Sequence, residues 1–318
     1  MGKLEGCGRQ STLACIVTLS GTGVHTGRPS RVTLRPAEAD SGIRFRRTDL
    51  TNGTRSTVIK VDRHHVGSTR LCTELRNDDG TSVMTVEHLL AALGAAHIDN
   101  AEIHVSGPEI PILDGSAAEF FAAIEEAGVS ALDRARGFIR ILEAVSLQVG
   151  PASAHFLPEN RSVIESSIEF PHSAIGRQSF VYEASTETFR RDIAPARTFG
   201  FLAQARELRM AGYGLGASLD NTVVLDEQGV MNHGGLRFAD EFVRHKTLDA
   251  CGDLLFAGAP IIGRFRTARG GHHLNHTALN FLMSQAAAWE YVTADELENA
   301  TIGLEHPAPV EAGAAAHG

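Results

Sequence analysis

Strand patterns followed by helix patterns occur twice along this chain. Between residues 14 and 75, short runs that alternate polar with apolar residues predict strands, and strand patterns return between 137 and 184. Apolar residues spaced three and four positions apart predict helices at 85–96, 116–127, 240–257 and 274–292. This repeated order predicts an α+β fold with two similar domains, each a β-sheet packed on α-helices.

The predicted domain boundary lies within residues 128–137. It gives a first domain over 1–130 and a second over 131–305, which suits a chain of 318 residues. In the second domain, a short helix pattern stopped by glycine and a following strand pattern predict an insert at about 198–226. Residues 306–318 have little apolar surface, so we expect a mobile tail.

The expected helix at 240–257 carries the most informative spacing, because His245 and Asp249 stand one helical turn apart. Its apolar stripe is formed by Val243, Thr247, Ala250, Cys251 and Leu254. The opposite side carries Glu241, His245, Asp249 and Asp253. We expect this polar side to face a cleft. The same spacing also fits an exposed helix whose acidic and imidazole side chains are merely solvated.

A second helix supplies the missing metal ligand. The apolar face of the helix at 85–96 is formed by Val86, Leu89, Leu90 and Leu93, which turns Glu87 and His88 away from the core. His88 with His245 and Asp249 would make a two-histidine, one-carboxylate set with a coordination position left open, as catalytic zinc requires. Glu87, in the first helical turn, would be the general base. These ligands come from both halves, so we expect the site between the domains.

A cluster of histidines after two glycines offers the general acid. We predict that His272 lies on a loop at a helix entrance, where the helix dipole lowers its pKa. A partner carboxylate, for which we select Asp253, would then be needed to keep it protonated. We treat His273 and His276 as incidental, although the spacing does not decide which histidine matters.

Two other classes of protein fit the same ligand set. Two histidines and one carboxylate also bind iron in non-haem oxygenases, and a binding module with a structural metal would add a fourth protein ligand. A base and an acid beside the metal favour hydrolysis. Oxygen dependence of turnover and the number of protein ligands would separate these classes.

Composition and charge narrow the partners and the compartment. The net charge is −9 and no basic stripe occurs, which disfavours nucleic acid as a partner. The four cysteines form no CxxC pair and no signal peptide pattern is present, so we expect a cytoplasmic protein. The apolar stretches are too short for a transmembrane segment, which leaves peripheral membrane contact at most. We expect a monomer.

Six sequence blocks, in order, resemble the bacterial UDP-3-O-acyl-N-acetylglucosamine deacetylases, zinc amidases of the committed step in lipid A (lipopolysaccharide) biosynthesis. The resemblance extends from about residue 10 to 305. The blocks include TVEHLLAALGAAHIDN at 85–100, ARTFGF at 196–201, FVRHKTLDACGDLL at 242–255 and GGHHLNH at 270–276. The other two blocks lie at 20–50 and 108–120.

The resemblance implies a deacetylase with one catalytic Zn²⁺ per chain. The ion would be held by His88, His245 and Asp249, and the substrate would be UDP-3-O-(3-hydroxyacyl)-N-acetylglucosamine. Water bound to zinc would attack the acetamide, with Glu87 as general base and His272 as general acid. Ferrous iron in the cell stays an alternative to zinc. The family also implies the two-domain arrangement with its active site in the cleft.

The resemblance adds residues that spacing could not select. Thr198 is similar to a hydroxyl that helps hold the oxyanion, Phe199 to a wall over the sugar, and Lys246 to a substrate-contacting lysine. The strand-helix-strand insert would form a passage for the acyl chain, lined by Leu202, Ala205, Gly214, Ser218, Leu219, Thr222 and Val224. Simple packing of the insert explains these residues equally well. Glu74 departs from the small or thiol side chain that is common in the family, which puts details of substrate fit in doubt.

Overall fold

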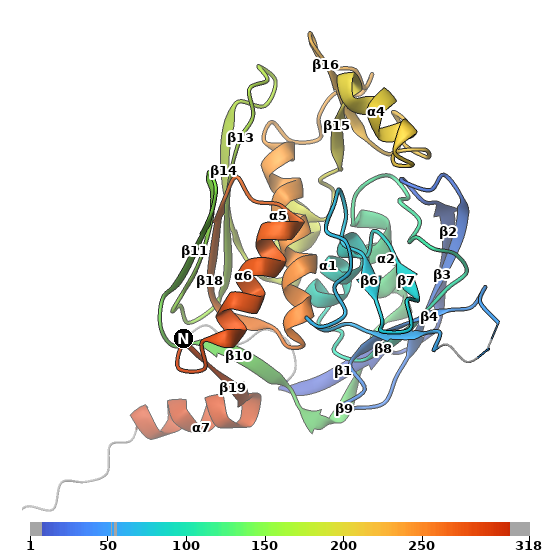
Figure 1. The fold of residues 1–318 in the computed structure, drawn as a ribbon. Helices are drawn as coiled ribbons and strands as arrows, with labels where there is room; N and C mark the ends of the chain where they lie inside the picture. The colour runs from blue at the N-terminus through green and yellow to red at the C-terminus, as the bar shows by residue number, and fades with distance from the viewer. Residues whose placement is uncertain (1–7, 52, 54–55, 306–318) are drawn as a thin grey trace, which may run out of the picture.

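The structure is a computed structural model that describes residues 8–305 except 52 and 54–55. Figure 1 shows a β-sheet on each side of the molecule and helices between the sheets. Helices from the two halves of the chain meet in the middle. This arrangement confirms the predicted α+β class. The tail predicted for residues 306–318 lies outside the described residues.

A five-stranded sheet is built from the first half of the chain. Its strands run in the order β2 (Val17–Thr22), β3 (Pro29–Pro36), β8 (Ala101–Val105), β4 (Ile43–Arg47) and β5 (Val58–Lys60). Along β3, Ser30, Val32 and Leu34 are buried while the residues between them are more exposed, as the alternating sequence predicts. The helices of this half are α1 (Glu87–Ala95) and α2 (Ala118–Ala127), close to the predicted ranges.

A seven-stranded sheet is built from the second half. The main order is β11 (Val145–Val149), β12 (Ala152–Leu157), β18 (Ile261–Ala268), β10 (Gly137–Ile141) and β19 (Trp289–Thr293). Two further strands are β13 (Ser162–Glu169), parallel to β18, and β14 (Arg177–Glu183), antiparallel to β13. The helices of this half that bear on the site are α5 (Glu241–Leu254) and α6 (His272–Ser284).

The stretch predicted as the domain boundary contains a strand. β9 (Val129–Ala135) pairs antiparallel with β1 (Arg9–Leu13), so the two ends of the first half lie together. Each large sheet takes all its strands from one side of this stretch. One apolar core nevertheless runs through both halves and includes Leu90 of α1 and Leu248 of α5. The division into domains at residue 130 stays a prediction.

The predicted bounds of two elements were wrong. The helix expected at 274–292 begins two residues earlier, at His272, and ends at Ser284. The stretch WEYVT at 289–293 is strand β19, which pairs with β10 along its length. Its aromatic and β-branched residues suit a sheet edge, and pairing with a distant strand outweighed the helical periodicity. Of the strand patterns between residues 14 and 75, the last one, at 69–75, is reduced to β6 (Leu75–Arg76), which pairs with β7 (Ser82–Val83).

The insert of the second half projects beyond helices α1 and α5 (Figure 1). β15 (Phe199–Phe201) runs parallel to β16 (Val223–Asp226), and a short 3-10 turn and α4 (Ala205–Met210) come between them in the chain. β17 (Gly229–Val230) completes this small sheet. Gly212 follows α4 with a φ of +82°, the left-handed conformation that suits glycine after a helix end.

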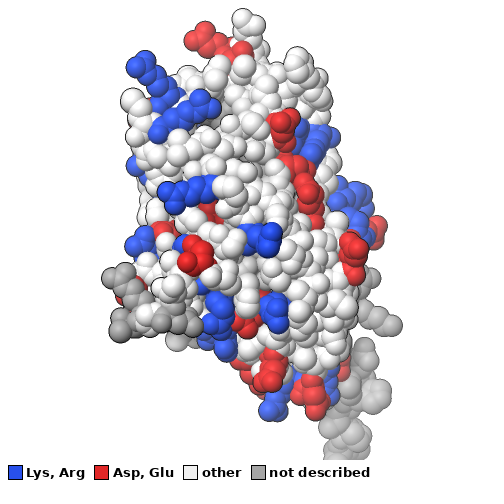
Figure 2. All heavy atoms as spheres, turned by 90° about the vertical axis from the view of Figure 1, so that its right-hand side faces the viewer, with Lys and Arg blue, Asp and Glu red and all other residues white. Residues whose placement is uncertain are grey.

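Four further elements complete the described fold. They are α3 (Thr186–Thr188), a π-helical turn at Phe189–Ile193, a 3-10 turn at Leu255–Ala257 and α7 (Ala294–Glu305). None of the helices in the described part of the chain is long and apolar enough to cross a membrane. On the face shown in Figure 2, positive and negative side chains are interspersed and form no basic stripe.

Helices α1 and α5 approach each other closely at Gly252. A Cβ built on this glycine would lie 2.0 Å from the carbonyl oxygen of Glu87, so any larger residue would collide with the α1 backbone. Glycine therefore lets the first turn of α1 lie directly on α5. This contact puts Glu87 and His88 beside the polar face of α5.

We predict that Gly252→Ala destabilises the protein by about 1–3 kcal/mol, because the added methyl group must push the two helices apart. Chemical denaturation measures this loss of unfolding free energy. Gly94→Ala is the matched control, since its Cβ would meet Leu255 only at an ordinary 3.5 Å. There we expect no loss, or a gain of up to about 1 kcal/mol from helix propensity. Equal effects of the two substitutions would contradict the close approach.

Candidate active site

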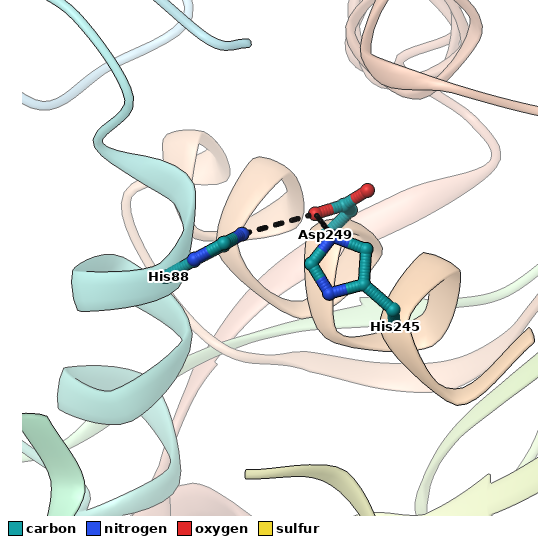
Figure 3. A group of neighbouring side chains, drawn as sticks. All are labelled: His88, His245 and Asp249. Carbon is teal, nitrogen blue, oxygen red and sulfur yellow. Dashed lines mark ion pairs between the residues drawn. The ribbon is translucent and has the colours of Figure 1, made fainter. Parts of the chain in front are cut away.

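The two helices bring together the three predicted metal ligands. His88 Nε2 lies 3.6 Å and His245 Nε2 3.4 Å from Oδ1 of Asp249. One ligand atom from each of the three residues lies within 4.8 Å of the others. Figure 3 shows His88 pointing from α1 toward His245 and Asp249 on α5. Residues 157 positions apart in the chain thus face one point in space.

These side chains lie deeper than the sequence predicts. His88, His245 and Asp249 are 2–3% exposed, although we expected the polar side of α5 to face an open cleft. That expectation was wrong for these residues, because α1 and α6 both pack against this side. Of the residues of α5, only Arg244, Lys246 and Cys251 are not buried.

The donor set fits a divalent metal ion. Asp249 Oδ1 is buried and has no hydrogen-bond partner among the described residues, which costs free energy unless a cation satisfies it. The Nδ1–H of His245 donates to the carbonyl oxygen of Ala196 at 3.1 Å, which leaves Nε2 free to bind a metal. Burial lowers the pKa of His245 to about 3, so its imidazole is neutral, the form that ligates.

Asp249 is held in its ionised form. Burial raises the pKa of this carboxyl, but His245, Lys246 and His272 together hold it well below its ordinary value. Lys246 Nζ donates to Asp249 Oδ2 at 2.8 Å, which leaves Oδ1 as the oxygen nearest the two imidazoles. Two imidazole nitrogens and one carboxylate oxygen suit zinc or ferrous iron.

The predicted base and acid lie side by side at this point. His272 Nε2 is 3.7 Å from Glu87 Oε1. Burial favours the neutral forms of both groups. It raises the pKa of Glu87, although the charges of His272 and His88 oppose this shift. The raised pKa makes Glu87 a stronger base.

The pKa of His272 is raised, whereas burial alone would lower the pKa of a histidine. Burial lowers its pKa, but the carboxylates of Asp253 and Asp249 outweigh burial and raise the pKa to about 9. The Nδ1–H of His272 donates to Asp253 Oδ2 at 2.9 Å, as the selection of Asp253 predicts. His272 is the first residue of α6, not a loop residue, and it remains protonated despite the helix dipole.

Three further residues belong to this network, and our reading of the sequence did not select them. Thr73 Oγ1 donates to Asp253 Oδ1 at 2.6 Å, and the amide of Asn275 donates to Asp253 Oδ2 at 2.8 Å. His276, which we treated as incidental, is buried with Nε2 3.2 Å from Asp253 Oδ1. Its spacing of four from His272 places it on the same helix face, a signal that was available. Nothing in the sequence marks Thr73.

The segment carrying Thr198 and Phe199 lies against the metal helix. Glu241 is fully buried and accepts from the backbone N–H and from Nε of Arg197, at 3.0 and 2.8 Å. The Phe199 ring contacts the His245 ring with centroids 6.2 Å apart, and Lys246 Nζ lies 5.6 Å from its centroid. Glu241 therefore anchors this segment and does not line a cleft.

The residues predicted for the acyl passage all belong to the insert, but they differ in exposure. Leu202 and Leu219 are exposed, whereas Thr222 is buried and its hydroxyl donates to Asn221. Their role as a passage stays a prediction. Glu74, in contrast, is buried in the loop before α1, where its carboxylate accepts from Ser68 and Arg76.

Comparison with known proteins agrees with this geometry. Residues 10–284 match the family model of UDP-3-O-acyl N-acetylglycosamine deacetylase. The chain belongs to this deacetylase family. The match covers both helices that carry the candidate metal ligands, and it extends through α6 with the candidate acid.

Several Brucella species have proteins that are similar to this chain. Proteins of Brucella ovis, Brucella canis and Brucella melitensis biotype 2 that are named UDP-3-O-acyl-N-acetylglucosamine deacetylase are each 46% identical to the chain over 286 residues. The similarity covers 90% of the chain and 99% of each relative. The resemblance found in the sequence blocks is therefore confirmed.

Proposed function

We propose that this protein removes acetate from UDP-3-O-(3-hydroxyacyl)-N-acetylglucosamine in lipid A biosynthesis. Membership of the deacetylase family and the printed name of the 46% identical relatives support the reaction. The observation that carries the proposal is the convergence of His88, His245 and Asp249 at one point, with Glu87 and His272 3.7 Å apart beside them. Metal-assisted hydrolysis of an amide uses a metal site, a base and an acid at one place.

In this proposal His88, His245 and Asp249 hold one divalent ion, and we favour zinc over ferrous iron. Such an ion supplies Lewis-acid chemistry, because it polarises a carbonyl and acidifies water. The ligand group in the described residues has three members, which suits a catalytic site with an open position better than a closed structural site. Neutral His245 and ionised Asp249 are already in the forms that bind a metal.

Glu87 acts as the general base in the attack on the acetamide. Its Oε1 faces the site and takes a proton from the attacking water, while Oε2 is held by the backbone N–H of Thr73 at 3.1 Å. Attack forms a carbon–oxygen bond and puts negative charge on the acetamide oxygen. The hydroxyl of Thr198 is proposed to donate to that oxygen, and Phe199 and Lys246 are proposed to position the sugar nucleotide.

His272 acts as the general acid when the carbon–nitrogen bond breaks. It delivers its Nε2 proton to the departing amine, and the products are acetate and the free amino sugar. Asp253 accepts from Nδ1 on the other side of the ring, which fixes the ring orientation and stabilises the protonated form. Glu87 then passes the proton that it took from water to His272, directly or through solvent, which restores the starting protonation of both groups.

The direct test is release of acetate from the acylated UDP-N-acetylglucosamine by the purified protein. Acetate and the deacetylated UDP-sugar should form in equal amounts. The 3-O-acyl group should stay on the sugar. Loss of the acyl chain in place of acetate, or no product at all, would overturn the proposed reaction.

We predict that His272→Ala lowers kcat by about 100-fold to 10,000-fold, because the leaving amine loses its proton donor. Metal content and thermal unfolding should stay close to those of the wild type, since His272 is not among the proposed ligands. His273→Ala is the matched control, because His273 is exposed on the same helix. Turnover retained by His272→Ala would remove this residue from the acid role.

The pH dependence of kcat/KM should be bell-shaped. Activity is lost as pH falls through the raised pKa of Glu87, because the base must be ionised. It is also lost as pH rises through about 9, where His272 gives up its proton. The two limbs belong to the coupled pair.

Asp253→Asn tests which group determines the alkaline limb of this pH profile. It removes the carboxylate that raises the pKa of His272, so the alkaline limb should move to lower pH, whereas the acidic limb should move much less. An alkaline limb that stays in place in Asp253→Asn would contradict the assignment.

Gly214→Leu tests the acyl passage. Apart from its two chain neighbours, no described residue has an atom within 4 Å of the position of a Cβ at Gly214, so a leucine side chain there would start in open space. We expect kcat/KM for a long-chain substrate to fall about tenfold relative to a short-chain substrate. The ratio is the readout, because the backbone strain of a side chain at φ +65° affects both substrates equally. An unchanged ratio would place the passage elsewhere.

A further inference from the structure

Thr73 contacts the proposed base and the carboxylate that orients the proposed acid. Its backbone N–H donates to Glu87 Oε2 at 3.1 Å, and its hydroxyl donates to Asp253 Oδ1 at 2.6 Å. The residue is completely buried. It contacts the base itself and the carboxylate that orients the acid.

The backbone around Thr73 is fixed from both directions. Its carbonyl oxygen accepts from the N–H of Val86, the residue just before α1, at 3.3 Å. The next residue, Glu74, forms two backbone hydrogen bonds across the loop, with Gly67 and Ser68. The Glu74 carboxylate also accepts from the Ser68 N–H at 2.9 Å and from Arg76 at 2.8 Å. The buried Glu74 thus holds the loop that carries Thr73.

The Asp253 carboxylate depends on Thr73 for its orientation. Its Oδ2 accepts from His272 and from Asn275, while its Oδ1 accepts from Thr73 and lies 3.2 Å from His276 Nε2. Without the Thr73 hydroxyl, His276 is the remaining donor to Oδ1 in the described network. Rotation of the carboxylate would turn the His272 ring and change the distance from its Nε2 to Glu87.

We propose that Thr73 is a positioning residue that sets the placement of the base Glu87 relative to the acid His272. The inference rests on the proposed deacetylase function, since it assigns those two roles. Thr73 reaches the reaction through Glu87, Asp253 and His276, whose Nε2 lies 3.1 Å from the Thr73 hydroxyl oxygen. Its loss should therefore lower the rate of the chemical step and leave substrate binding nearly unchanged.

Thr73→Val tests the hydroxyl, because valine keeps the branched shape and the backbone N–H to Glu87. We expect kcat to fall about 10-fold to 100-fold, the usual effect of losing a hydrogen bond to a charged group, with KM changed less than about threefold. Thr73→Ser restores the hydroxyl and should keep kcat within about threefold of the wild type. A normal kcat in Thr73→Val would overturn the proposal. Loss of kcat in Thr73→Ser would overturn it too, even if the valine variant did not fold.

A double-mutant cycle shows whether Thr73 acts through Asp253. In the Asp253→Ala background, Thr73→Val should cause much less further loss of kcat, because the carboxylate that accepts from the hydroxyl is already absent and His276 Nε2 is the remaining group close to it. An equal loss in both backgrounds would mean that Thr73 supports the fold only. Metal content and thermal unfolding of each variant separate a positioning effect from loss of structure. Failure of the wild type to release acetate would overturn the proposed function and not the geometry around Thr73.

Discussion

The close packing of α1 on α5 is the contact on which the site depends. At Gly252 the missing side chain lets the carbonyl oxygen of Glu87 approach to a distance that no Cβ would permit. The same contact places His88 beside Asp249 and His245, and brings Glu87 near His272. Because the helices come from different halves of the chain, the metal ligands and the acid–base pair are assembled only in the folded protein. Stability and chemistry are therefore linked through one interface.

Burial of so many ionisable groups is tolerated because each has a specific partner. Lys246 satisfies one oxygen of Asp249, and the other oxygen is left for a cation. Asp253 accepts from Thr73, Asn275 and His272 and stays ionised, with its pKa held far below the ordinary value despite burial. The protein thus keeps two carboxylates charged while burial raises the pKa of Glu87 and Asp253 raises that of His272. Different surroundings thus adapt Glu87 to act as a base and His272 to act as an acid, as is common in catalytic sites.

Periodicity in the sequence predicted much of this arrangement, because local spacing decides which side chains share a helix face. It predicted α1, α2 and α5, and it selected His88, His245 and Asp249 as the ligands. It did not predict β19, which forms by pairing with the distant β10, nor the burial of the polar side of α5, which depends on α1 and α6. Thr198, Phe199 and Lys246 came from family resemblance alone. Thr73 could not be found either way, because its proposed role rests on contacts with Glu87, Asp253 and His276 that only the fold creates.

Convergence of α1 and α5 on one catalytic ion requires that acetate release depend on a bound metal. The protein should be purified, its metal content measured, and acetate release followed before chelation, after chelation and after zinc is added back. We expect one bound divalent ion per chain, loss of acetate release on chelation, and recovery with zinc. Asp249→Ala should bind no ion at this site and should not recover. Undiminished acetate release from protein that is free of metal would contradict the convergence of α1 and α5 on a catalytic ion.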